Sequence, residues 1–135
     1  MNANAAALLG YLVGIIAIVN LIIEKENNFV RFHAVQHIFF NITMVVLYIA
    51  LIVVLVILNF VVFAIGGVAA SAAGEAGGVI GLILSLITLL MWIVLPLLFI
   101  AIFLGGIIFA AIKSYQGEVF KFPIIGSLAA KVVPI

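Results

Sequence analysis

The sequence predicts an all-α integral membrane protein with about three transmembrane helices. Hydrophobic residues make up 70% of the 135 residues, charged residues make up 7%, and the mean hydropathy is +1.64. A soluble domain has about 25% charged residues, because its surface faces water. The apolar residues form three long runs that polar or glycine-rich segments separate. This chain therefore requires an apolar solvent, which is the lipid bilayer.

The composition also excludes several chemistries. The chain has no cysteine, so it has neither disulfides nor thiolate metal ligands. Its formal net charge of +1 gives no reason to expect a nucleic-acid partner. The four acidic residues are all glutamates that lie outside the apolar runs: Glu24, Glu26, Glu75 and Glu118. Because the sequence shows no Ser/His/acid set and no phosphate-binding loop, we expect no enzyme.

The first apolar run, residues 5–23, has about the 20 residues that cross a bilayer. No basic residues precede it and no small-residue cleavage site follows it, so we expect a retained span rather than a signal peptide. Small residues recur along it at helical spacing, which predicts an internal packing face or, alternatively, a dimer contact. These residues are Ala6, Gly10, Gly14 and Ala17.

The second run, residues 29–65, is too long for one simple crossing, because as a helix it would extend about 55 Å. We expect residues 29–37 to form an interfacial lead-in and residues 38–60 to cross. A Gly/Ala loop over residues 66–78 follows. The last run crosses at residues 82–112 with a kink at Pro96, and residues 113–135 form a membrane-associated tail.

The basic residues predict the orientation. All five lie in the first loop or in the tail: Lys25, Arg31, Lys113, Lys121 and Lys131. The positive-inside rule places both groups in the cytoplasm, which three spans satisfy if the N-terminus lies outside. Four spans, with two short ones meeting at Pro96, are the alternative. We expect the protein in a prokaryotic cytoplasmic membrane, where its partners are the lipid bilayer and other membrane proteins or a homo-oligomer.

Polar side chains share one stripe of the predicted helix over Phe29–Tyr48. They are His33, His37, Asn41 and Tyr48, with Gln36 beside them. We expect this stripe to face neighbouring helices. Phe32, Val35, Ile38 and Phe39 lie on the other side, where the phenylalanines should face lipid or the interface. Arg31 should extend to lipid phosphate and set the depth of the helix.

His33 and His37 are the main candidate ligands for a cofactor, and Glu24 or Glu26 could join them only if the loop folds back. Their spacing allows both imidazoles to bind one metal ion, but the sequence has no third histidine or cysteine to complete a closed site. Ligation of haem or chlorophyll is an alternative, as is a proton relay through Asn41 and Tyr48. The main interpretation is hydrogen bonding between helices, with no cofactor.

Two motifs carry a resemblance to a known family. An acidic-basic-x-Asn loop runs into Phe-Val-Arg-Phe-His-Ala-x-Gln, and Tyr-x-Gly is followed by Pro-x-Ile-Gly. The first motif includes Glu24, Lys25, Asn28, Phe29, Arg31, Phe32, His33 and Gln36, and the second includes Tyr115, Gly117, Pro123 and Gly126. The chain resembles the Tic-twenty-like family, small membrane proteins related to a subunit of the chloroplast import translocon.

That resemblance implies a non-enzymatic structural or protein-translocation-associated component, with both motifs on the cytoplasmic face. Two other functions stay open. One is an accessory subunit of a respiratory or photosynthetic complex that binds haem or (bacterio)chlorophyll through His33 or His37. The other is a small oligomeric channel or carrier.

Overall fold

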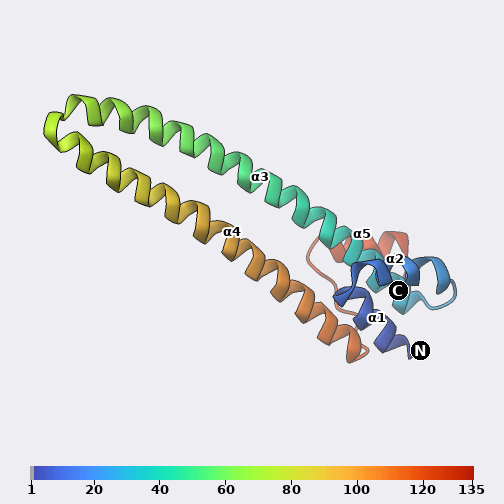
Figure 1. Cartoon of the computed structure of the whole chain (residues 1–135). Helices are drawn as coiled ribbons and strands as arrows, with labels where there is room; N and C mark the ends of the chain where they lie inside the picture. The colour runs from blue at the N-terminus through green and yellow to red at the C-terminus, as the bar shows by residue number, and fades with distance from the viewer. Residues whose placement is uncertain (1) are drawn as a thin grey trace. The chain divides into compact units, whose positions relative to one another are not determined.

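The computed structural model describes residues 2–135, and every regular element in this range is helical (Figure 1). The elements are α1 (Ala3–Leu12), α2 (Gly14–Ile23), α3 (Asn28–Ala72), the short 3₁₀ helix η1 (Gly74–Ala76), α4 (Gly77–Tyr115) and α5 (Ile125–Val132). They belong to two compact units. The terminal unit contains the chain up to Val45 and from Ile102 onward, and the hairpin unit contains Val46–Ala101.

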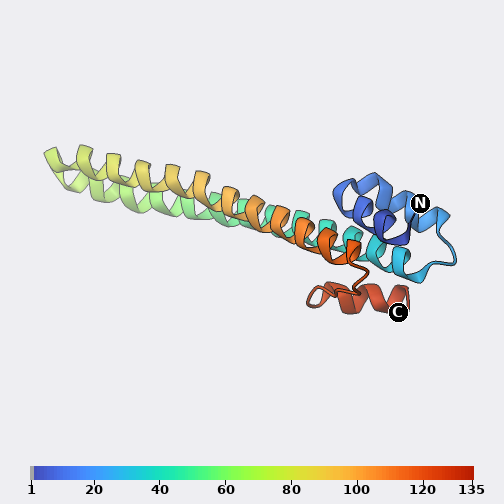
Figure 2. The same ribbon diagram turned by 90° about the horizontal axis from the view of Figure 1, so that it is seen from below.

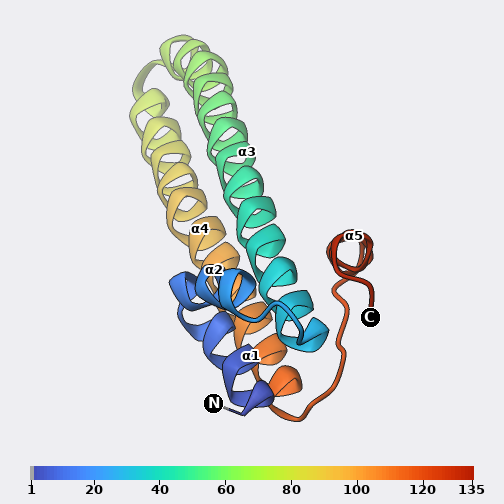
Figure 3. The ribbon, with the colours of Figure 1, turned by 90° about the vertical axis from the view of Figure 1, so that its right-hand side faces the viewer.

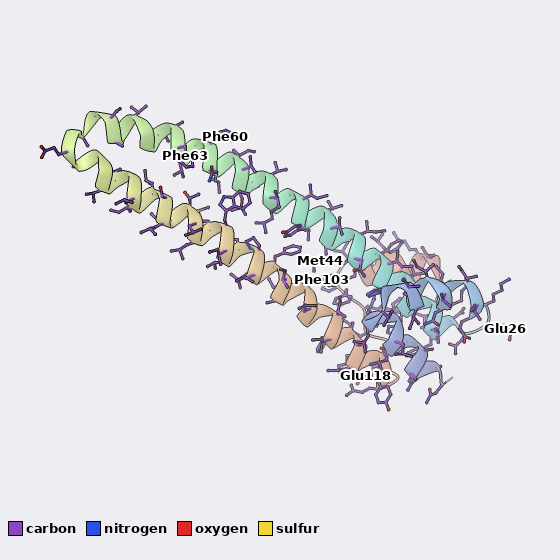
Figure 4. The ribbon with its side chains drawn as sticks, viewed as in Figure 1. Glu26, Met44, Phe60, Phe63, Phe103 and Glu118 are labelled. Carbon is purple, nitrogen blue, oxygen red and sulfur yellow. The ribbon has the colours of Figure 1, made fainter. Side chains whose placement is uncertain are left out.

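The hairpin unit is formed by the adjoining parts of α3 and α4. Among residues 2–135 these are the two helices long and apolar enough to cross a membrane, with hydropathies of 3.2 and 2.9. Their large apolar side chains are exposed, and Figure 4 shows Phe60 and Phe63 on α3. Phe60 is 73% exposed, which is costly in water but not in lipid. The exposed side chains therefore match a lipid environment.

The turn of the hairpin is shorter than the expected Gly/Ala loop over residues 66–78. Helix α3 continues to Ala72, and α4 begins at Gly77. Gly74 has φ +59°, a left-handed conformation that glycine adopts without strain. A side chain at Gly77 would collide with the carbonyl group of Ala70. Glycine thus allows a tight turn within the expected Gly/Ala loop.

Helix α4 is continuous from Gly77 to Tyr115 and includes Pro96, so two short spans do not meet there. Ser85 and Thr88 donate hydrogen bonds to carbonyl groups of their own helix, those of Gly81 and Leu84. These side chains therefore do not link α4 to another helix.

Residues 5–23, expected as one span, do not form one continuous helix. Val13 has an extended conformation and separates α1 from α2. Each helix has 10 residues and is about 15 Å long, which is half of a hydrocarbon core. The two helices contact each other where Gly10 lies against Ala17, and Asn20 Nδ2 donates to the carbonyl oxygen of Ala6 at 2.8 Å. Small residues and one buried amide thus favour a helical hairpin over a span.

The N-terminus lies beside the start of the tail, not on the opposite side from it. Asn4 Nδ2 donates to the carbonyl oxygen of Tyr115 at 3.0 Å, at the end of α4. Figure 2 shows α1 and this end of α4 together in the terminal unit. The beginning of the chain and the start of the tail are therefore in contact within the terminal unit. The side of the membrane on which the N-terminus lies stays a prediction.

Part of the tail forms α5, which packs against α3. Figure 3 shows α5 after the extended segment that leaves α4. Ala129 and Val133 lie against Phe32 and Val35, and all four are at most 4% exposed. The expectation that Phe32 faces lipid or the interface is therefore wrong, because α5 covers it. Residues 29–37, expected as an interfacial lead-in, form much of the interior of the terminal unit. Their depth in the membrane stays a prediction.

Candidate functional site

A buried hydrogen-bonded cluster joins the two sequence motifs in the terminal unit. Gln36 Nε2 donates to the Tyr11 hydroxyl at 2.8 Å, and that hydroxyl lies 3.2 Å from His33 Nδ1. Tyr11, His33 and Gln36 are at most 2% exposed. The pKa of Tyr11 is raised, because the effect of burial is larger than the opposing effect of the hydrogen bond from Gln36. The hydroxyl therefore remains protonated. A neutral imidazole that accepts this proton at Nδ1 carries its own proton on Nε2.

Gln36 also holds the extended tail that precedes α5. Its Nε2 donates to the carbonyl oxygen of Phe120 at 3.1 Å, and the Phe122 N–H donates to its Oε1 at 3.3 Å. One side chain thus satisfies two backbone groups of a partly buried extended segment that has no strand partner. Through this contact Gln36 connects α1, α3 and the tail.

His37 lies one helical turn beyond His33 and has a different hydrogen-bond partner. Asn41 Nδ2 donates to His37 Nε2 at 2.8 Å and to the His37 carbonyl oxygen at 2.9 Å. His37 and Asn41 line a cavity of about 350 Å³ together with Tyr11 and the apolar residues Ile38, Ile42 and Ile107. With Nε2 accepting from Asn41, the neutral imidazole carries its proton on Nδ1.

Aromatic rings enclose His33. The ring centroids of Phe29, Phe32 and Tyr11 lie 4.6, 5.4 and 5.8 Å from that of the imidazole. A haem or chlorophyll on His33 would have to displace these rings, so the arrangement favours packing over ligation. No group of three or more metal-ligating side chains occurs within residues 2–135. Cofactor binding by His33 or His37 stays a prediction.

The remaining residues of the first motif shape the entry to α3. Glu24 caps α2 through its N–H, which donates to the Asn20 carbonyl oxygen. Arg31 Nη1 donates to the Lys25 carbonyl oxygen at 3.3 Å, so Arg31 closes the loop instead of extending away from it. Asn28 begins α3. Glu24 and Arg31 thus stabilise the loop between α2 and α3 through hydrogen bonds to its backbone or from it.

The residues of the second motif shape the tail. The Tyr115 carbonyl accepts from Asn4, and Gly117 has φ +78°, which lets the chain turn away from α4. The Pro123 carbonyl accepts from the Ile125 N–H at 2.7 Å, and Gly126 is buried against Lys121 and Gln36. The two motifs thus meet at Gln36.

Of the predicted packing residues, Ala6, Gly10 and Ala17 are buried in the contact between α1 and α2. Gly14 is exposed and lies on a different side, near His37 Nε2. Sequence reasoning missed Tyr11 and the backbone of Phe120 and Phe122. Tyr11 is the one aromatic residue in the first apolar run, and this could have marked it as a candidate for the site.

These features define a helical membrane protein with two long apolar helices and a terminal unit closed by buried hydrogen bonds. Residues 1–129 match the magnetosome magnetite crystal formation protein family, MamF/MmsF, and the chain belongs to this family. No curated protein and no solved structure matches the chain.

This match corrects the resemblance to the Tic-twenty-like family, which is wrong. The matched range includes both motifs, so the Phe-Val-Arg-Phe-His loop and the Tyr-x-Gly…Pro-x-Ile-Gly tail belong to a MamF/MmsF chain. The inference of a protein-translocation component came from the resemblance alone and has no other support.

Proposed function

We propose that this protein is a non-enzymatic integral component of the magnetosome membrane that takes part in forming the magnetite crystal. The observation that carries the proposal is the family match over residues 1–129. The structure adds two helices of spanning length and a polar cluster whose members bond to one another. The membrane is therefore the magnetosome membrane in place of the expected cytoplasmic membrane.

In this proposal α3 and α4 cross as a hairpin, with the terminal unit on the cytoplasmic face and the turn at Glu75 inside the vesicle. All five basic residues belong to the terminal unit, whereas Glu75 is the one charged residue of the hairpin unit. The positive-inside rule favours this orientation. The 45 residues of α3 extend about 67 Å, so part of the helix reaches beyond the hydrocarbon core.

Single-cysteine labelling tests the topology without background, because the chain has no cysteine. With a membrane-impermeant maleimide, we expect Asn2→Cys and Ser127→Cys to react from one side and Glu75→Cys from the other. All three positions are exposed. If Asn2→Cys reacts from the same side as Glu75→Cys, residues 5–23 cross the membrane and the two-span topology is wrong.

The role in crystal formation is tested by deleting the gene in its host and measuring magnetosome crystals by electron microscopy. We expect crystals of altered size or number, and we expect the wild-type gene to restore them. The variant Gln36→Leu should restore them poorly, whereas Gln116→Leu, which changes an exposed glutamine, should restore them fully. A host that forms no magnetite, or unchanged crystals after deletion, contradicts the proposal.

A further inference from the structure

A second hollow in the terminal unit lies between α3 and α5, away from the polar cluster. Its volume is about 380 Å³. Helix α3 contributes Phe39, Ile42 and Thr43 to its lining, and α5 contributes Ile125, Leu128, Lys131 and Val132. The lining is apolar except for one hydroxyl and one ammonium group. We call it the α3–α5 groove.

The residue pattern of α5 explains why the groove is open. Gly126 and Ala129 face the interior, and their small size lets α5 lie close to Phe32 and Val35. The larger residues Leu128 and Val132 do not face this interior; they line the groove and are 44% and 57% exposed. Ile124, four residues before Leu128, is 78% exposed. These exposed apolar side chains on a short helix favour a lipid environment over water.

The charge around the groove is positive. Lys131 is exposed, and no acidic residue belongs to the lining. Within residues 2–135 the ion pair is between Lys113 and Glu118, so Lys131 has no carboxylate partner there. Lys121, the neighbour of Gly126, lies over the Phe32 ring at 5.8 Å and adds a second cation beside α5.

We propose that the α3–α5 groove binds an anionic phospholipid of the membrane. The acyl chain lies along Phe39, Ile42 and Leu128, and the headgroup phosphate lies at Lys131. A peptide or a soluble anion would match either the apolar lining or the lysine, but not both. A phospholipid has an apolar chain for the lining and a negative phosphate for the lysine. The inference depends on a membrane-bound terminal unit and is independent of any role in crystal formation.

Native mass spectrometry of the full chain in mild detergent tests the proposal. We expect the wild-type protein to retain one phosphatidylglycerol and to bind it more tightly than phosphatidylcholine. Lys131→Gln should weaken phosphatidylglycerol binding about fivefold, the factor for one lysine at an anionic membrane surface. Thr43→Phe fills the groove without changing charge and should reduce retention of the same lipid.

Lys25→Gln is the matched control, because Lys25 is exposed but lies on the first loop and not in the groove. It should leave phosphatidylglycerol binding unchanged. Equal losses in Lys25→Gln and Lys131→Gln would overturn the proposal, since binding would then follow net charge. Equal retention of phosphatidylcholine, or displacement of the lipid by inorganic phosphate alone, would also overturn it.

Discussion

Replacing Gln36 with leucine should detach the tail from the terminal unit and lower the free energy of unfolding by about 3 kcal/mol. Leucine keeps the volume but cannot bond to the Tyr11 hydroxyl, the Phe120 carbonyl or the Phe122 N–H. The site is 0% exposed, so water does not replace these partners while the tail stays in place. Buried polar groups without partners cost more than the net contribution of the bonds themselves.

Limited trypsin digestion and denaturant unfolding in detergent measure this effect. Cleavage after Lys121 should be faster in Gln36→Leu than in the wild type, because Lys121 lies in the segment that Gln36 holds. Gln116→Leu is the control, since Gln116 is an exposed glutamine next to Gly117. Unchanged cleavage after Lys121 in Gln36→Leu would mean that other contacts hold the tail.

Gly126→Ala should destabilise the terminal unit by about 2 kcal/mol, although the substitution adds one methyl group. A Cβ at Gly126 would lie 2.6 Å from Lys121 Cβ, 2.7 Å from Lys121 Cα and 2.9 Å from Gln36 Oε1. Two of these neighbours are the backbone of the tail and a hydrogen-bonded amide, which cannot move freely. Helix α5 must therefore shift away from Phe32 and Val35.

The same unfolding measurement tests this substitution, with Gly105→Ala as its control. No atom lies within 4 Å of a Cβ at Gly105, which is inside α4, so alanine there should be neutral or stabilise by about 0.5 kcal/mol. The effects of Gly126→Ala and Gln36→Leu should not add, because both release the tail. Strict additivity would show that the two residues stabilise separate parts of the fold.

The sequence by itself determined the class of the protein and the location of its charges. Hydropathy is a local property, so α3 and α4 were predictable as membrane helices from their composition. The helical spacing of His33, Gln36 and His37 predicted one polar face, and all three are buried as that face requires.

Only the tertiary structure decided what each apolar segment does. Residues 5–23 have the length of a span, but the break at Val13 and the hydrogen bond from Asn20 to Ala6 make them a hairpin. Phe32 has a side chain suited to lipid, yet α5 covers it. The physical reason is that an apolar side chain can be buried equally well by lipid or by protein. Contacts between residues far apart in sequence, such as Gln36 with Phe120, therefore select the outcome.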